Sequence, residues 1–281
     1  AIHIAGSVEA FVELMNERAQ GLGCTGTHFA NPHGYEDKEH YSTALDLARI
    51  AREGMKNEVY RKIVGAPSFT IAANNMREKD TTYRSKNQFV AEDESMEYRY
   101  EYGTGIKTGY FSAAKHTFVA SASKDGVDLI AVGLGSTQQG KWIDAQRLMD
   151  YGFAICQPYS LAELYAASPV ELEVGEEEKL ALSFAPDQDL ALADSRESID
   201  AMRQNFSAYC SFAPNTVVNL PPIAQGQGMG ALTVTPPGGQ SLSYTMVASR
   251  SVEELAVAGD SMDQGENAGG GRPVWRVVLL G

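Results

Sequence analysis

The chain has 281 residues, which is enough for one large domain or two modest ones with cores of their own. Hydrophobic content of 43% and charged content of 21% are ordinary for a folded soluble protein. The net charge of −13 argues against nucleic acid as a partner, because phosphate binding needs a basic face.

The negative charge is unevenly distributed along the chain. Residues 1–159 hold 17 basic and 20 acidic side chains, a net charge of −3, whereas residues 160–281 hold 6 and 16, a net charge of −10. The shift coincides with "QPYSLAEL" and predicts a domain boundary near residue 158. We therefore expect a first domain, a β-domain, a flexible linker and a terminal apolar segment, at 1–158, 159–250, 251–273 and 274–281.

The first predicted elements are helices. Residues 7–22 have apolar side chains at helical spacing, and residues 42–57 predict a second helix after a loop marked by Asn-Pro and His-Gly. Thr43 and Asp46 form a capping box at the start of that helix, which accounts for Asp46 without a catalytic role. Its apolar stripe is predicted to include Leu45, Ile50 and Met55.

A β-rich unit follows residues 66–100, for which no element is predicted. Three strands are indicated by "GTGIKTG", "HTFVASAS" and "VDLIAVGLG", with Asp125-Gly126 as the turn between the last two. The segment "QQGKWIDAQRLMDYGF" predicts a helix over that sheet. Its side chains available for packing on the sheet are Trp142, Ile143, Leu148 and Met149.

After residue 160 the pattern changes to short apolar runs separated by turn residues, which is typical of a small antiparallel β-domain. These runs are "VELEV", "KLALSF", "DLALA", "TVVNL", "GALTV" and "LSYTMVAS". The last residues, "VWRVVLLG", follow a Gly-rich acidic linker and fit either a final strand or the first turns of a membrane anchor. The anchor is favoured, because a linker of this composition should not precede an integral strand.

Lys107, Thr108 and Gly109 end the first strand of the β-rich unit and suit a substrate with a terminal carboxylate. The lysine ammonium supplies a point charge and the threonine a hydroxyl donor. The glycine lets a peptide lie alongside the strand as an added edge strand. The next backbone N–H, that of Tyr110, could form half of an oxyanion hole. An ordinary strand end with the same three residues is the alternative interpretation.

The segments "THFANPHGYEDKEHYSTALDLARIAR", "GTGIKTGYFSAAKHTFVASASKDGVDLIAVGLG" and "KWIDAQRLMDYGF" resemble the D-alanyl-D-alanine carboxypeptidases, which are low-molecular-weight penicillin-binding proteins of the S11 serine peptidase type. The resemblance covers about nine tenths of the chain. It implies an α/β (α+β) partial β-lactamase/transpeptidase-like domain followed by a small all-β C-terminal domain.

The resemblance also implies site residues and partners. Lys107, Thr108 and Gly109 would contact the substrate carboxylate, and the Tyr110 N–H would be an oxyanion donor. Catalysis in this family needs Ser-x-x-Lys, Ser-x-Asn and Lys-Thr-Gly in that order, and only the last is expected to function here. The implied substrate is a peptidoglycan stem peptide ending in D-Ala-D-Ala, with β-lactams trapped at the same serine of the intact protein. The implied location is the outer face of the cytoplasmic membrane, without a cofactor.

Two further Ser-x-x-Lys matches follow the triplet but have the wrong secondary structure for a nucleophile and its base. The motif works at a helix start, where both side chains lie on one face. Ser112 and Lys115 are predicted in a turn, and Ser121 and Lys124 in a strand, where residues three apart point to opposite faces. We therefore expect the serine nucleophile to be absent from these residues and this chain alone to be inactive.

The remaining candidate groups receive structural interpretations. Ser85 and Asn87 match Ser-x-Asn formally but are taken as a polar approach to the strand. The group His28, His33, Asp37, Glu39 and His40 lacks the spacing of a metal site, so no metal is expected. The cysteines Cys24, Cys156 and Cys210 are odd in number and widely spaced, which favours free, buried thiols.

Two alternatives to a carboxypeptidase remain open at this stage. One is a non-catalytic module that holds cell-wall peptides in the Lys-Thr-Gly cleft. The other is a hydrolase similar to the class A β-lactamases. The appended β-domain, the linker and the "NPHG" and "YSTALDLA" segments argue against the second.

Overall fold

The computed structural model describes residues 1–93, 95–174, 178–215, 221–253 and 277–279. The chain divides into two compact units, Ala1–Ile155 and Cys156–Gly281, called the first and second unit below. The first unit contains α1 (Ile2–Ala5), α2 (Val8–Gly21), α3 (Ala44–Gly54), α4 (Glu58–Gly65), β1 (Ser68–Ile71), β2 (Thr81–Arg84), η1 (Gln88–Val90), β3 (Gly103–Phe111), β4 (Lys115–Lys124), β5 (Val127–Ser136) and α5 (Gly140–Ile155).

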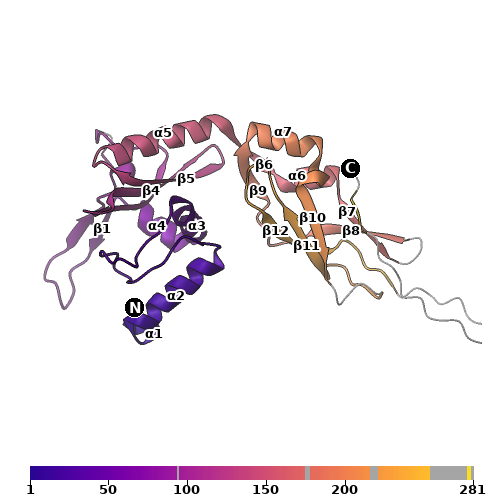
Figure 1. The fold of residues 1–281 in the computed structure, drawn as a ribbon, viewed down its shortest axis with the longest axis horizontal. Coiled ribbons are helices and arrows are strands. Elements are labelled where there is room, and N and C mark those ends of the chain that lie inside the picture. Colours follow the sequence, from indigo (N-terminus) through magenta and orange to yellow (C-terminus); the bar gives the residue numbers. More distant parts are fainter. Residues whose placement is uncertain (94, 175–177, 216–220, 254–276, 280–281) are drawn as a thin grey trace, which may run out of the picture. The chain divides into compact units, whose positions relative to one another are not determined.

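The centre of the first unit is an antiparallel sheet in the order β3-β4-β5 (Figure 1). All three strands were predicted from the sequence. Asp125 and Gly126 join β4 to β5 with φ angles of 50° and 79°. Positive φ at both central residues is what a tight hairpin turn requires, and an aspartate followed by a glycine tolerates it.

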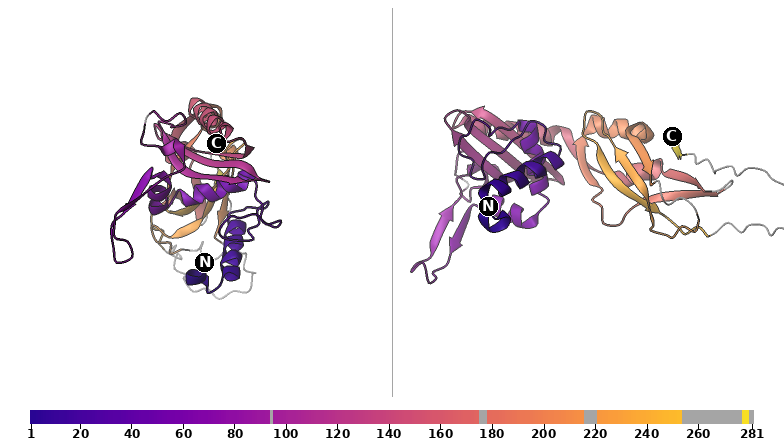
Figure 2. Two further views of the ribbon diagram at one scale, coloured as in Figure 1. Left: turned by 90° about the vertical axis from the view of Figure 1, so that its left-hand side faces the viewer. Right: turned by 60° about the horizontal axis from the view of Figure 1, so that its bottom comes forward.

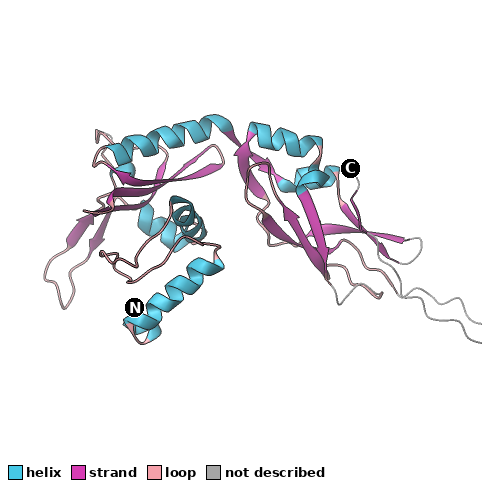
Figure 3. Ribbon diagram, viewed as in Figure 1, coloured by secondary structure: helices cyan, strands magenta, loops and turns pink. Residues whose placement is uncertain are grey.

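Helix α5 covers one face of this sheet, and α3 and α4 contact the strands from the other side (Figure 3). Trp142 and Met149 of α5 are buried against β4, as predicted. The prediction was wrong for Ile143 and Leu148, which are 37% and 50% exposed. The reason is that α5 buries only a narrow stripe at 141, 142, 145 and 149, so side chains beside that stripe remain in solvent.

Helix α3 begins near the predicted residue, but only one of the two hydrogen bonds of the predicted capping box is present, because the Asp46 carboxylate has other partners. The Thr43 side chain accepts a hydrogen bond from the Asp46 N–H at 3.1 Å, which is an ordinary N-cap. Leu45, expected on the apolar stripe, is instead 54% exposed, whereas Ile50 and Met55 are half-buried. The stripe of α3 is therefore shorter at its N-terminal end than the sequence pattern suggested.

Residues 66–100, for which no element was predicted, contain the β1–β2 hairpin. Figure 2 shows it extending away from the sheet. Phe69 pairs with Tyr83 across the two strands, and both remain at least half exposed. Little core supports these strands, which explains why hydrophobic alternation did not reveal them.

The second unit combines two sheets with two helices. Its elements are β6 (Cys156–Ser160), α6 (Leu161–Ala167), β7 (Val170–Val174), β8 (Glu178–Phe184), β9 (Ala191–Ser195), α7 (Arg196–Gln204), η2 (Phe206–Tyr209), β10 (Cys210–Pro214), β11 (Gly228–Val234), β12 (Leu242–Ala248) and β13 (Val277–Leu279). The larger sheet has the order β10-β11-β12-β8-β7-β13, and β6 pairs with β9. Every strand pair is antiparallel, and α6 and α7 contribute buried side chains to the same core.

Two predicted features fall partly or wholly outside the described residues. The run "TVVNL" and most of the expected linker lie outside them. In the terminal segment, Val277–Leu279 pairs with β7, so these three residues form a strand. Within the described residues, no helix has the length and apolar character that crossing a membrane requires.

The three cysteines are free thiols. Cys24 is buried, whereas Cys156 and Cys210 are half-buried. Burial raises the pKa of all three thiols, for Cys210 to about 12. A raised pKa keeps the thiolate fraction low at neutral pH, so these cysteines are poor nucleophiles.

Candidate functional site

The Lys-Thr-Gly triplet lies on β3, which pairs with β4 alone among the described strands. No described strand pairs with its other edge, called the open edge below, although α4 and η1 also contact β3. Residues directly opposite each other in an antiparallel pair share a face of the sheet, so the register assigns each side chain to a face. The pairs are Lys107 with Val119, Thr108 with Phe118, Gly109 with Thr117 and Tyr110 with His116.

Phe118 identifies which face is which. Its side chain is 1% exposed and lies edge-on to the ring of Trp142 in α5, with 4.8 Å between ring centroids. Thr108, opposite Phe118, therefore projects to the face covered by α5. Lys107 and Gly109 belong to the opposite face, toward α3 and α4. The lysine and threonine of the triplet thus flank the open edge from its two sides.

The ammonium group of Lys107 lies along its own strand, next to the following residue. Nζ donates a hydrogen bond to the carbonyl oxygen of Thr108, and the side chain is otherwise exposed. Among the described residues, no carboxylate lies within ion-pair distance of this ammonium group. A cation held beside a strand edge without a counter-ion can accept the carboxylate of an approaching peptide.

Gly109 is required by packing within the sheet. A methyl group built on its Cα would come within 2.5 Å of Thr117 Oγ1 on the neighbouring strand. Such a contact is too short to persist, so a side chain at 109 would displace Thr117 or separate β3 from β4. Packing against Thr117 therefore explains why position 109 is a glycine, in addition to the proposed approach of a substrate.

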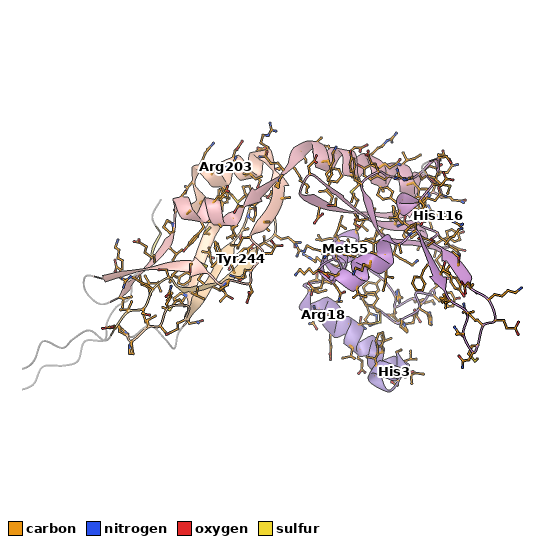
Figure 4. The ribbon with its side chains drawn as sticks, turned by 180° about the vertical axis from the view of Figure 1, so that it is seen from behind. His3, Arg18, Met55, His116, Arg203 and Tyr244 are labelled. Carbon is orange, nitrogen blue, oxygen red and sulfur yellow. The ribbon has the colours of Figure 1, made fainter. Side chains whose placement is uncertain are left out.

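Tyr110 follows the triplet and is 66% exposed. Its ring lies 4.4 Å, centroid to centroid, from that of His116, which Figure 4 labels in the first unit. This contact fixes the end of the β3–β4 pair before the hairpin turn. The role of the Tyr110 N–H as an oxyanion donor remains a prediction.

The two Ser-x-x-Lys matches do not bring their members together. Ser112 is exposed in the β3–β4 turn, and Lys115 begins β4 with a φ of 55°. Ser121 is 2% exposed and shares a hydrogen bond of 2.8 Å with Thr104. Lys124 lies over the ring of Tyr102 at 4.6 Å. Among the described residues, neither serine has a lysine within hydrogen-bond distance.

Ser85 and Asn87 organise the backbone before η1. Ser85 Oγ accepts a hydrogen bond from the Asn87 N–H at 3.1 Å, and Asn87 Oδ1 accepts one from the Phe89 N–H, also at 3.1 Å. Asn87 is only 5% exposed. These bonds place Phe89, which is fully buried, in the core under α5. They account for Ser85 and for Asn87 Oδ1 through local structure, whereas Asn87 Nδ2 is buried with no hydrogen-bond partner among the described residues.

The histidines of the loop at residues 27–42 make contacts within that loop. His33 Nδ1 accepts from the Tyr35 N–H and His40 Nδ1 from the Ala30 N–H, each at 3.2 Å, while His28 Nδ1 lies within hydrogen-bond distance of the Glu39 carbonyl. Burial lowers the pKa of His40, which favours the neutral ring that this acceptor role needs. No three His, Cys, Asp or Glu side chains of the described ranges could hold a metal ion together.

Asp46 has a larger role than the capping position assigned from the sequence. Its carboxylate is 2% exposed and accepts hydrogen bonds from the Gly26 N–H and Thr27 Oγ1 at 2.8 Å and from Arg49 Nη1 at 2.9 Å. Burial alone would raise the pKa of Asp46, but these donors outweigh it and hold the pKa below its usual range. Asp46 thereby ties the loop to α3.

Asn16 of α2 holds the same loop from the other side. Its side-chain amide donates to the Phe29 carbonyl at 2.9 Å and accepts from the Phe29 N–H at 2.7 Å. The Asn16 amide thus bonds both the N–H and the carbonyl of Phe29, as the backbone of a neighbouring strand would. Nothing in the local sequence indicates this contact, because an asparagine on a helix surface is ordinary.

Lys141 is a second cation that the sequence analysis missed. It lies in the first turn of α5, is 9% exposed, and its Nζ is 4.7 Å from the ring of Trp142. Burial lowers its pKa, and no ion pair compensates it within the described residues. A positive charge in the first turn of a helix is unfavourable because of the helix dipole, and this was the one indication in the sequence that Lys141 is unusual. Trp142 packs on Phe118, so Lys141 and Thr108 share one side of the sheet.

Comparison with known proteins gives a family for the first part of the chain. The sequence profile of peptidase S11, described as D-alanyl-D-alanine carboxypeptidase, matches residues 1–138. That range contains α1 to α4, the three-stranded sheet and the Lys-Thr-Gly triplet.

Two curated relatives agree with the family match. The chain is 28% identical over 263 residues to the D-alanyl-D-alanine carboxypeptidase DacF of Bacillus subtilis, covering 91% of this chain and 61% of the relative. It is 34% identical over 168 residues to DacB2 of Mycobacterium tuberculosis, covering 58% of this chain and 54% of the relative. The chain therefore spans less than two thirds of the length of either protein.

Two solved structures share the fold. Penicillin binding protein 5 from Haemophilus influenzae matches with a TM-score of 0.59 and 24% identity, over 90% of this chain and 69% of that one. The D-alanyl-D-alanine carboxypeptidase DacD from Francisella tularensis matches with a TM-score of 0.52 and 21% identity, over 91% and 71%. Residues 1–138, which carry the Lys-Thr-Gly strand of the antiparallel sheet, belong to the D-alanyl-D-alanine carboxypeptidase family, peptidase S11.

Proposed function

We propose that this chain carries the substrate-anchoring strand of a serine-type D-Ala-D-Ala carboxypeptidase. The observation that supports the proposal most is the position of Lys107, Thr108 and Gly109 on an edge strand within the family match. The substrate class is a peptidoglycan stem peptide with a free carboxyl terminus. In the whole protein, such a peptide would acylate a serine and release its terminal D-alanine.

Peptide binding at this site combines backbone and carboxylate recognition. The open edge of β3 offers backbone groups to an extended peptide, which then lies as an additional strand. The Lys107 ammonium and the Thr108 hydroxyl approach the peptide carboxylate from the two sides of the edge. The Tyr110 N–H is the proposed oxyanion donor. Lys141 adds positive charge on the Thr108 side of the sheet.

Acyl transfer additionally needs a serine whose proton can be taken by a nearby base. Neither Ser112 nor Ser121 has a described lysine partner, and Ser121 is buried against Thr104. We therefore expect these 281 residues to bind peptide reversibly without forming an acyl-enzyme. The alternative interpretation, a non-catalytic binding module, gives the same expectation for the chain studied alone.

The proposed setting is the cell envelope. The proposed substrate is the stem peptide of assembled peptidoglycan, which lies outside the cytoplasmic membrane, so the proposed location is the outer face of that membrane. The proposed partners are D-Ala-D-Ala stem peptides and, in the intact protein, β-lactams. No cofactor is needed, because the chemistry uses side chains and backbone donors alone.

Peptide titration tests the proposed function. The ligand is a stem-peptide analogue with both amines acetylated and a free D-Ala-D-Ala carboxyl terminus. Amide NMR spectra of the full chain are expected to shift along β3, and Lys107→Ala should weaken binding about tenfold or more, because a charge-assisted bond is lost.

Two controls make that titration specific. The same peptide with its carboxyl terminus amidated should bind no better to the wild-type chain than to the Lys107→Ala variant. Lys115→Ala removes an exposed lysine from the same hairpin without touching the triplet, and should leave affinity unchanged. Equal affinity for the acid and the amide, or shifts that avoid β3, would reject the proposed site.

A further inference from the structure

A cavity in the second unit lies apart from the Lys-Thr-Gly strand. Its volume is about 250 Å³, and it is lined by β6, α6, the end of α7 and the start of η2. Tyr159, Leu164 and Phe206 provide an apolar lining and are themselves less than a tenth exposed. The cavity is therefore an open hollow at the surface, with a buried apolar floor and exposed polar residues, among them Glu163 and Arg203, around it.

Several polar side chains line this cavity without using their hydrogen-bonding groups. Glu163 and Gln204 have no side-chain hydrogen bond or ion pair among the described residues. Ser160 precedes α6 but makes no side-chain capping bond. Three such polar groups beside an apolar lining match the composition of small-molecule sites, which combine an apolar surface with a few polar groups.

Arg203 contributes positive charge to the same cavity. Its guanidinium makes one described contact, an ion pair of 3.4 Å with Asp200 one turn earlier on α7, and both side chains are more than half exposed. An exposed pair of this length contributes little, so most of the guanidinium donors remain available. Figure 4 labels Arg203 on α7 and Tyr244 on the sheet of the same unit.

Glu163 and Arg203 bring opposite charges to one cavity without neutralising each other. They come from different helices, and no ion pair joins them in the described structure. A ligand that carries both an ammonium and a carboxylate satisfies the two charges at once. We propose that this cavity binds a zwitterionic amino acid or dipeptide, with its ammonium at Glu163 and its carboxylate at Arg203.

The size of the cavity supports the same ligand class. Pockets for drug-sized molecules usually measure about 300–1,000 Å³, so a volume near 250 Å³ suits one or two small residues. Tyr159, Leu164 and Phe206 leave an apolar surface for the methyl side chains of such a ligand. The inference is independent of the function proposed for β3.

Titration with D-alanyl-D-alanine tests the inference on the full chain. At millimolar concentrations, the dipeptide is expected to shift amide NMR signals of α6 and of the end of α7. Glu163→Gln and Arg203→Gln should each weaken this binding about tenfold, because each removes a charge-assisted hydrogen bond from one end of the ligand.

Matched variants on α7 separate this effect from a general loss of charge. Arg196→Gln and Glu197→Gln change exposed residues of the same helix that do not line the cavity, and should alter affinity less than twofold. All four positions are exposed, so the variants are expected to fold. Thermal unfolding that matches the wild type shows that they do.

A second ligand distinguishes this cavity from β3. N-acetyl-D-alanyl-D-alanine keeps the carboxylate but lacks the ammonium, so it should lose binding at α6 and α7 while remaining a ligand for β3. The inference is overturned if D-alanyl-D-alanine shifts no signals around the cavity, if acetylation leaves those shifts unchanged, or if the α7 control variants weaken binding as much as Arg203→Gln.

Discussion

Gly109 lies directly opposite Thr117 in the β3–β4 pair, and a methyl group on Gly109 would approach Thr117 Oγ1 to 2.5 Å. The last residue of the Lys-Thr-Gly triplet is therefore constrained by the neighbouring strand as well as by any substrate. The effect of Gly109 on stability can be separated from its effect on peptide binding, because only the effect on stability depends on Thr117.

Gly109→Ala is expected to lower the free energy of unfolding of the first unit by about 1–3 kcal/mol, the usual cost of overpacking. Thr117→Ala in the same chain should restore most of that loss by removing the atom that clashes. Urea unfolding of the two single variants and the double variant measures the coupling. If Gly109→Ala is as stable as the wild type, or if Thr117→Ala rescues nothing, the packing argument is wrong.

Asp46 predicts a specific pH dependence of stability. Its pKa is lower in the folded chain than the usual value of about 3.9, so it stabilises the fold above that pH. The stabilisation is lost as pH falls through the lower, folded-state pKa. Asp46→Asn should lower the unfolding temperature by several degrees at neutral pH and flatten the decline in stability below about pH 4.

Asp128→Asn is the control for that experiment, since Asp128 is an exposed aspartate on β5. Its acid profile should follow the wild type. Glu53 and Asp93 also have lowered pKa values, so some decline persists in every variant. A profile for Asp46→Asn as steep as that of Asp128→Asn would contradict the assigned role.

The buried hydroxyl of Tyr165 is expected to stabilise the second unit. Its hydroxyl donates to the Leu182 carbonyl and accepts from the Val170 N–H, each at 3.0 Å, and the residue is 7% exposed. Tyr165→Phe leaves both backbone groups without that partner and should cost about 1–3 kcal/mol of unfolding free energy. Tyr209→Phe, which removes a hydroxyl without a described side-chain bond, should be neutral; equal losses would refute the prediction.

Features set by neighbouring residues were predicted from the sequence. The Asp125-Gly126 turn and the Thr43 cap each depend on a few adjacent positions, so local chemistry specifies them. The chemistry of Lys107 and Thr108 was likewise apparent from residue type, and the glycine suggested that a peptide could lie alongside their strand. Which face of the sheet each side chain occupies was not apparent, because it depends on the register between β3 and β4.

Features set by distant contacts could not be predicted. Asp46 binds Gly26 and Thr27 across a loop, and Asn16 pairs with the backbone of Phe29. Neither contact leaves a pattern in the local sequence. Leu148 appeared suitable for packing by residue type alone, but it lies beside the stripe of residues that α5 buries and is half exposed.

The two units should differ in stability. Among the described residues, the buried core cluster of the second unit has 20 members and that of the first has 8. Helix α2 buries only Ala19, while Ile2 and Ile4 of α1 are 66% and 70% exposed. Less apolar burial means less stabilisation, so the first unit should unfold at a temperature several degrees lower.

Trp142 reports on that difference directly, because it packs in the core of the first unit. Trp275→Phe leaves it as the single tryptophan of the chain. Fluorescence of this variant should change in the lower of two calorimetric transitions. A single cooperative transition, or a Trp142 signal that changes only in the upper one, would contradict the prediction.

The most direct test of the account is covalent labelling of the purified 281-residue chain with a fluorescent penicillin. An intact D-Ala-D-Ala carboxypeptidase serves as the positive control. We expect no label that survives denaturing electrophoresis, and the wild type should be indistinguishable from a chain carrying Ser112→Ala and Ser121→Ala. A stoichiometric label on the wild type that either substitution abolishes would contradict it, because one of these serines would then be a nucleophile.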